Sequence, residues 1–105
     1  MDKKSYQDYF FKKAKLKGFR SRSAFKLIEL NSKFKFLRNG LSVLDVGSFP
    51  GGWCQVIQKK IINSKILAID LKNIEKIDEV HFIKGDFLNI ESKIAIKKYF
   101  NSRMI

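Results

Sequence analysis

One run of ten residues, Leu44–Trp53, constrains this chain more than any other feature. It reads LDVGSFPGGW: an apolar strand that carries an acid, a glycine-rich turn, and the start of a helix. Glycines let the backbone approach a small ligand closely, and the N-terminal amides of a helix favour a negative group. The run therefore predicts a ligand-binding strand–turn–helix unit. The alternative is a tight turn of the kind found between any strand and helix.

The same run excludes the commoner nucleotide-binding loops. It lacks the Gly-Lys-Ser/Thr ending of a Walker loop. Phe49 stands where a dinucleotide fingerprint needs its second glycine, so NAD binding of that kind fits poorly.

Composition narrows the class of protein further. The 105 residues are enough for one small domain, and the net charge of +12 favours a polyanion such as RNA, DNA or an acidic membrane. No apolar run approaches the roughly 20 residues of a membrane span, and the N-terminus lacks an apolar secretory core. A single cysteine, Cys54, and a single histidine, His81, predict neither an internal disulfide nor a His/Cys zinc site. We expect an intracellular protein without a metal or a membrane partner. It would be cytoplasmic, with a nucleolar or organellar place left open, and its oligomeric state is not predicted.

Hydrophobic periodicity predicts helices that alternate with strands. The expected elements are a helix that Ser21 or Ser23 caps and that runs to about Leu37, strand 41–46, helix 53–62, strand 65–70, strand 80–84 and helix 89–100. Inward-facing residues are predicted to be Ala24, Leu27, Ile28, Phe34, Leu37, Val56, Ile57, Ile61, Ile90, Ile94 and Ala95. This order is typical of an α/β fold with a parallel sheet.

Residues 1–20 form a basic and aromatic N-terminal arm ahead of the α/β unit at 21–105. A short helix is expected before Gly18. Basic side chains interleaved with aromatics suit contact with RNA phosphates and bases, although a solvated arm would look the same. The candidate RNA-binding residues are Lys12, Lys13, Lys15, Lys17, Arg20 and Arg22.

Three acids fall at or near predicted strand ends. Ligands in open α/β sheets bind beyond the carboxyl ends of the strands. Asp70 follows Gly47 at close to the ~20-residue offset at which an acid reaches the hydroxyls of a ribose. Asp86 follows Gly85 after the next strand, where it could face an adenine amino group, and Asp45 lies in the first strand. Each acid could instead be a helix cap or a turn residue.

Two runs together resemble the FtsJ-type ribosomal-RNA ribose 2′-O-methyltransferases. They are SRSAFKL at 21–27 and VLDVGSFPGGW at 43–53, followed by Asp70 and by Gly85-Asp86-Phe87. The resemblance implies S-adenosylmethionine as cofactor, with ribosomal RNA or a ribosomal subunit as partner. Its implied cofactor-binding residues are Asp45, Gly47, Pro50, Gly51, Gly52, Trp53, Asp70, Asp86 and Phe87. Ser48-Phe49 and Cys54 depart from the family's usual residues.

Lys26 matches the first lysine of the family's Lys-Asp-Lys-Glu catalytic set. From composition alone it is a solvated lysine on a polar helix face. The resemblance implies instead a catalytic residue that orients the target 2′-hydroxyl and helps to lower its pKa.

The other three catalytic positions of the family have no counterpart in residues 1–105. The resemblance therefore predicts a Rossmann-like methyltransferase fold truncated after about three parallel strands, with strand 41–46 at an exposed edge. Two functions stay open: the cofactor-binding half of an RNA 2′-O-methyltransferase, or a non-catalytic basic RNA-binding module with a degenerate pocket.

Overall fold

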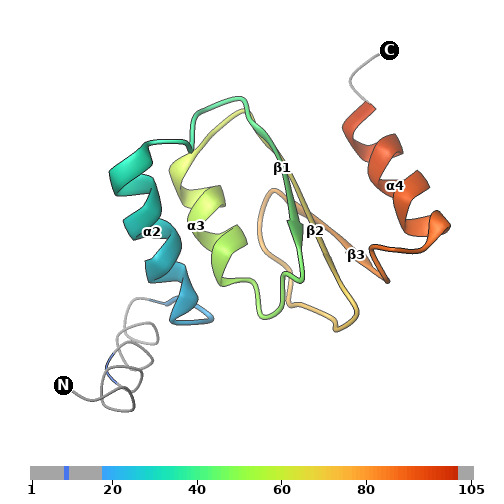
Figure 1. The fold of residues 1–105 in the computed structure, drawn as a ribbon, viewed down its shortest axis with the longest axis horizontal. Coiled ribbons are helices and arrows are strands. Elements are labelled where there is room, and N and C mark those ends of the chain that lie inside the picture. Colours follow the sequence, from blue (N-terminus) through green and yellow to red (C-terminus); the bar gives the residue numbers. More distant parts are fainter. Residues whose placement is uncertain (1–8, 10–17, 102–105) are drawn as a thin grey trace.

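The computed structural model describes Tyr9 and residues 18–101, which form an α/β unit (Figure 1). The expected helix before Gly18 and the lysines at 12, 13, 15 and 17 lie outside the described residues, apart from Tyr9, which is helical. The elements are α2 (Ser23–Phe34), β1 (Ser42–Val46), α3 (Gly52–Lys60), β2 (Lys65–Asp70), β3 (Val80–Lys84) and α4 (Ile90–Asn101). The predicted alternation of helices and strands is confirmed.

Three parallel strands form one sheet in the order β1-β2-β3. The register places Val46 beside Ile69, and Ile69 beside Ile83. The central strand is buried from Ile66 to Ile69, as expected where helices cover both faces of a parallel sheet. Figure 1 shows α2 and α3 on one side of the strands and α4 on the other. All three strands end at the same edge, which is where the glycine turn begins.

The main core lies between α3 and the sheet. Val56, Ile57 and Ile61 face inward as predicted, and Ala24 and Leu27 of α2 join them. Ile66 and Ala68 supply the sheet side of this core. Packing of α2 onto α3 therefore carries the SRSAFKL run to the glycine turn.

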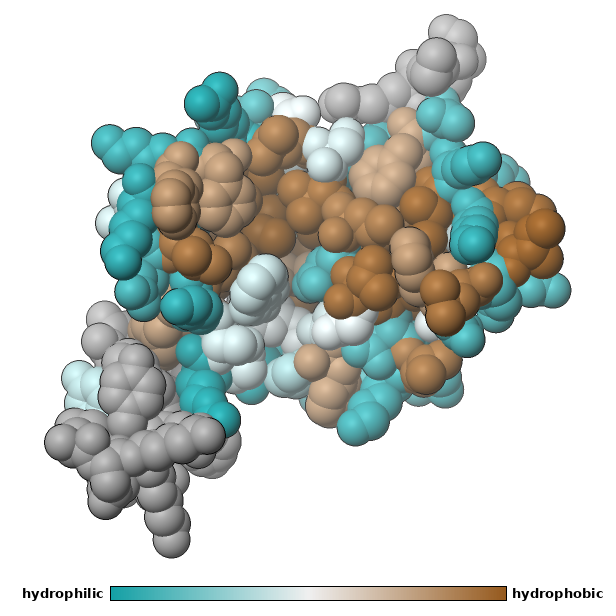
Figure 2. Space-filling model, in the orientation of Figure 1, coloured by the Kyte–Doolittle hydropathy of each residue, from teal (hydrophilic) through white to brown (hydrophobic). Residues whose placement is uncertain are grey.

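β1 is an edge strand, as predicted, and part of it faces solvent. Leu44 and Val46 are 37% and 50% exposed. A cavity of about 510 Å³ runs along the strand, between Leu44 and the segment that holds Phe36 and Leu37. Figure 2 shows apolar surface over this part of the molecule.

Helix α2 ends earlier than predicted, because Asn31 accepts hydrogen bonds from the backbone that follows the helix. Lys35 adopts a left-handed conformation with φ of 50°, and its N–H donates to the Asn31 carbonyl at 2.7 Å. The Asn31 side chain then accepts the Leu37 N–H at 2.9 Å. Phe34 is consequently 70% exposed, so its predicted burial is wrong, whereas Leu37 packs against the core.

Helix α2 begins at Ser23, but the prediction that Ser21 or Ser23 caps it is wrong. Arg22 is the N-cap residue, and no side chain caps the helix. The hydroxyls of Ser21 and Ser23 lie 2.7 Å apart and bond each other instead.

The inward face of α4 differs from the predicted one. Ile90 and Ile94 are 69% and 60% exposed, while Ser92 is buried. Tyr99 sets this orientation: its ring stacks on His81 at 5.0 Å, and its hydroxyl donates to the Ile66 carbonyl at 3.3 Å. The small Ser92 lets the helix approach Gly85, where an added Cβ would lie 2.9 Å from the serine Oγ.

Candidate functional site

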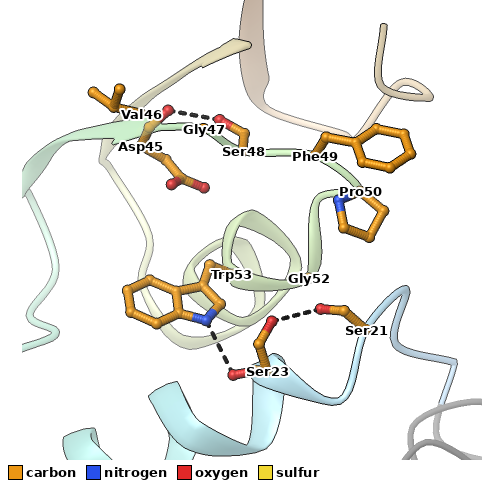
Figure 3. Close-up of a pocket in the computed structure, with 10 residues that line it drawn as sticks. All are labelled: Ser21, Ser23, Asp45, Val46, Gly47, Ser48, Phe49, Pro50, Gly52 and Trp53. Carbon is orange, nitrogen blue, oxygen red and sulfur yellow. Dashed lines mark hydrogen bonds between the residues drawn. The ribbon is translucent and has the colours of Figure 1, made fainter. Parts of the chain in front are cut away.

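Two cavities meet at the carboxyl ends of the strands. The first, of about 230 Å³, lies between the glycine turn and the start of α2 (Figure 3). The second, of about 300 Å³, lies between the ends of the three strands. Val46 and Gly47 line both. The first is also lined by Ser21, Ser23, Asp45, Ser48, Phe49, Pro50, Gly52 and Trp53, and the second by Ile69, Asp70, Leu71, Gly85, Asp86, Phe87 and Leu88. The structure thus brings together the predicted residues of three strand ends.

Ser48 fixes the turn to the sheet from inside. It is 5% exposed; its hydroxyl donates to the Asp45 carbonyl at 2.6 Å and accepts the Ile69 N–H at 3.1 Å. The Ile69 carbonyl in turn accepts the Gly47 N–H at 2.9 Å. The hydroxyl therefore continues the pairing of β1 with β2 where the ladder ends. Sequence reasoning missed this role, and the only signal was a serine at the end of an apolar strand.

Asp70 holds the turn from the second cavity. Its carboxylate accepts the Phe49 N–H and the Lys72 N–H, both at 2.9 Å. These backbone donors, Lys72 first, hold the pKa of Asp70 below its ordinary value, so the group is ionised at neutral pH. Each carboxylate oxygen has further lone-pair capacity, and the residue lines the cavity. The acid predicted to bind a ribose therefore faces a space in which a ligand can reach it.

The glycines of the turn do different things. Gly47 has φ of +75°, and an added Cβ would meet nothing within 4 Å, so its surface is open to both cavities. Gly51 has φ of +115° and is buried, and its Cβ would lie 2.9 Å from both Arg20 Nη1 and Ile77 Cδ1. Close approach to a ligand is thus available at Gly47. At Gly51, Arg20 and Ile77 leave no room for a side chain. Contact of Gly51 with a cofactor stays a prediction.

Asp45 lies in the first cavity against the base of α3. The buried Cys54 thiol donates to its Oδ2 at 3.2 Å. Burial raises the pKa of Asp45, which the Cys54 hydrogen bond partly offsets. Burial and the adjacent Asp45 raise the pKa of Cys54, so the thiol keeps its proton and acts as a donor. Asp45 and Asp70 therefore have opposite pKa shifts on the two sides of one turn.

Trp53 joins the two sequence runs. Its indole Nε1 donates to the Ser23 carbonyl at 3.0 Å, which places the ring against the start of α2 (Figure 3). Ser21 and Ser23 line the first cavity beside it, and sequence reasoning did not single them out as site residues. Lys26 is exposed on the next turn of α2. It borders the site rather than lining either cavity.

Asp86 and Phe87 form the far wall of the second cavity. The Gly85 N–H donates to the Asp70 carbonyl at 3.0 Å, so this segment lies beside the end of β2. The Asp86 carboxylate accepts the Leu88 N–H at 2.9 Å, and the Phe87 ring is 37% exposed. An acceptor and an aromatic face therefore adjoin the cavity.

The predicted RNA-binding residues are placed only in part. Arg22 is exposed at the start of α2. The Arg20 guanidinium donates to the carbonyls of Pro50, Glu75 and Lys76. Contact of Arg20 with RNA stays a prediction, and these bonds give the side chain a second task that the sequence did not indicate.

Within Tyr9 and residues 18–101, no helix is long and apolar enough to cross a membrane. In the same part of the chain, no three His, Cys, Asp or Glu side chains gather as metal ligands would.

The fold and the paired cavities define a Rossmann-like domain with a ligand site at its strand ends. Residues 19–105 match the FtsJ-like methyltransferase family, and the chain belongs to that family. It is similar to two proteins named ribosomal RNA large subunit methyltransferase E. The one from Pelagibacter ubique is 42% identical over 101 residues, which cover 96% of this chain and 50% of that protein. The one from Archaeoglobus fulgidus is 43% identical over 95 residues, 90% of this chain and 49% of that protein.

A solved structure agrees with these relatives. A crystal structure described as a ribosomal RNA methyltransferase from Plasmodium falciparum matches with a TM-score of 0.70 and 40% identity. The match covers 78% of this chain and 49% of that one. The predicted family and the Rossmann-like fold, with three parallel strands among the described residues, are confirmed. The chain spans about half the length of the relatives it matches.

We expect Ser48→Ala to lower the free energy of unfolding by about 1–3 kcal/mol, because it removes a partner from a buried N–H and a buried carbonyl. Urea denaturation measures the change. Ser42→Ala, at an exposed position of β1, is the matched control. Equal losses in the two variants would contradict the role of the hydroxyl.

Asp45→Asn tests the buried carboxyl. A pKa that is raised in the folded state means that ionisation opposes folding. The wild type therefore loses stability as the pH rises through the folded pKa of Asp45, and the asparagine variant escapes this loss. Unfolding free energies of both proteins should differ little below about pH 4. The variant should gain relative to the wild type at higher pH and then level off. The exposed Asp78→Asn controls for net charge, and a gap that shrinks with pH would contradict the assignment.

Proposed function

We propose that this chain supplies the cofactor-binding half of an RNA ribose 2′-O-methyltransferase that uses S-adenosylmethionine. The observation that carries the proposal is the pair of cavities that meet at Gly47, with Asp70 on the nucleoside side and the start of α3 on the other. A cofactor with a nucleoside at one end and an amino acid at the other needs two such spaces in contact.

The residues present fit this cofactor. Asp70 is an ionised acceptor for ribose hydroxyls, and Phe87 with Asp86 offers an apolar face and an acceptor for a base. Gly52 and Trp53 begin α3 at the wall of the first cavity, where helix amides favour a carboxylate. When bound, S-adenosylmethionine supplies an electrophilic methyl group.

Lys26 is the candidate catalytic residue of this half. It is exposed one turn beyond Ser23, which lines the first cavity, and the proposed role requires its ammonium to reach a ribose laid over that cavity. A positive charge there orients the 2′-hydroxyl and favours its deprotonated form. Methyl transfer needs further groups, which the family carries beyond the positions matched by this chain.

The proposed substrate is ribosomal RNA. The net charge of +12 provides the sequence-independent attraction to phosphates that such a substrate needs. The matched relatives in Pelagibacter and Archaeoglobus are named as ribosomal RNA methyltransferases. Binding would use the basic arm together with Arg22, and it would take place wherever ribosomes are assembled in the cell.

A non-catalytic RNA-binding module is the second candidate. It is favoured by one observation, the net charge of +12, which suits a polyanion partner whether or not the pocket holds a cofactor. Such a module would bind RNA through the same basic residues, and its pocket would have lost affinity for the cofactor. Cofactor binding therefore separates the two functions.

Calorimetric titration of S-adenosylmethionine and S-adenosylhomocysteine into the 105-residue chain should give saturable binding of both. Asp70→Ala should weaken both by about tenfold to a hundredfold, the scale of a hydrogen bond to a charged group, because the ribose is common to the two ligands. Asp78→Ala, an exposed acid away from both cavities, is the control. Absence of binding by the wild type would favour the second candidate, and a loss for one ligand alone would contradict the ribose role.

Deletion of residues 1–17 tests the arm. Neutralised phosphates release counterions, so RNA affinity falls with salt more steeply when more lysines make contact. We expect the deletion to weaken RNA binding and to flatten its salt dependence, with cofactor affinity unchanged. Fluorescence titrations at several salt concentrations measure both quantities. If affinity and slope survive the deletion, the RNA contact lies on the folded domain instead.

A further inference from the structure

The Arg20 side chain donates hydrogen bonds to backbone carbonyls in two loops, the glycine turn and the connector between β2 and β3. Nη1 donates to the Glu75 carbonyl at 2.7 Å and to the Pro50 carbonyl at 3.1 Å. Nη2 donates to the Lys76 carbonyl at 3.0 Å. The planar, forked guanidinium can satisfy several acceptors at fixed angles, which a lysine ammonium on a flexible stem cannot reproduce. The arginine therefore ties the glycine turn to the connector between β2 and β3.

The backbone on which Arg20 sits is itself fastened to α3. The Gln55 side chain accepts the Arg20 N–H at 2.8 Å through Oε1 and donates to the Gly18 carbonyl at 3.1 Å through Nε2. Both functions of one amide are thus used on the segment that leads into α2. The backbone that carries the guanidinium is therefore held in place beside the turn.

Both glycines of the Gly51-Gly52 pair make room for this segment. A Cβ on Gly51 would lie 2.9 Å from Arg20 Nη1, and a Cβ on Gly52 would overlap Ser21 Oγ. Figure 3 shows Ser21 beside Gly52 at the start of α3. The Arg20-Ser21 pair therefore packs closely against the Gly51-Gly52 pair.

The Phe49–Pro50 segment is held from two sides. Asp70 accepts the Phe49 N–H on the side of the second cavity, and Arg20 holds the Pro50 carbonyl on the opposite side. Phe49 and Pro50 both line the first cavity. Loss of either anchor frees this wall to move, while the core beneath it stays packed.

We propose that Arg20 is a positioning residue for the candidate cofactor pocket, acting through the Pro50 carbonyl. This inference rests on the proposed function, because it concerns affinity for S-adenosylmethionine. It assigns the guanidinium to the pocket wall instead of to an RNA phosphate. The two roles differ in their chemistry, since a phosphate accepts a lysine in place of an arginine far more readily than three divergent carbonyls do.

The test compares Arg20→Ala and Arg20→Lys with Arg38→Ala and Arg38→Lys, which change an exposed arginine in the loop after α2. Cofactor affinity is measured by calorimetry without RNA and corrected for the folded fraction from thermal melting. Both Arg20 variants should bind at least about tenfold more weakly, the scale of one hydrogen bond made by a charged group. Both Arg38 variants should bind as the wild type does. If Arg20→Ala does not fold, Arg20→Lys decides the outcome.

A second readout does not depend on the cofactor. The backbone amide resonances of Gly51 and Gly52 should shift in Arg20→Lys and stay in place in Arg38→Lys. Wild-type affinity in Arg20→Lys, or unmoved glycine resonances, would overturn the inference, and so would a loss of RNA affinity alone. If the wild type binds no cofactor, the proposed function fails, and the glycine resonances still decide whether Arg20 positions the turn.

Discussion

The structure depends on satisfying backbone polar groups where two parallel strands stop pairing. At the end of β1 the chain must leave the sheet while the Ile69 N–H of β2 is still buried. The Ser48 hydroxyl accepts that N–H and donates to the Asp45 carbonyl, so one side chain replaces a rung of the ladder. Without such a partner, a buried donor costs about 1–3 kcal/mol. The chain can therefore turn away from the sheet at this point. The position of this turn sets where both cavities open.

The carboxylates of Asp45 and Asp70, on the two sides of this turn, differ in their surroundings. Asp45 is partly buried beside the Cys54 thiol, and this burial raises its pKa. Asp70 is half-buried and accepts backbone N–H groups, and its pKa is lowered. Two aspartates near the ends of adjacent strands thus have different electrostatic surroundings, Asp45 in the first cavity and Asp70 in the second. The assignment comes from local desolvation and hydrogen bonding, since the residue types are identical.

Much of this could be predicted from the sequence because its signals are local. The three strands, the order of elements and the inward face of α3 follow from apolar runs and periodicity. The family followed from two runs of residues that the fold places in contact. The strand ends also follow, because parallel strands must bring Asp45, Asp70 and Asp86 to one edge.

Features that depend on partners distant in the sequence could not be predicted. Tyr99 selects the buried face of α4 through His81 and Ile66, and periodicity alone favoured Ile90 and Ile94. One local feature was also missed, because the Asn31 side chain accepts the Leu37 N–H, which ends α2 and leaves Phe34 exposed. Arg20 lies among basic residues that suggest RNA, while its partners are carbonyls at 50, 75 and 76.

At the edge of β1, an attraction and a repulsion between copies of this chain oppose each other. Among residues 18–101 no strand pairs with the outer side of β1, and its free backbone groups beside exposed Leu44 and Val46 favour edge-to-edge association of copies. The net charge of +12 repels those copies, but this repulsion reaches only about 10 Å at 0.1 M salt and less at higher concentrations. Added salt therefore weakens the repulsion and leaves the apolar attraction in place. The chain stays dispersed most readily in dilute buffer, the condition in which it also holds a polyanion most tightly.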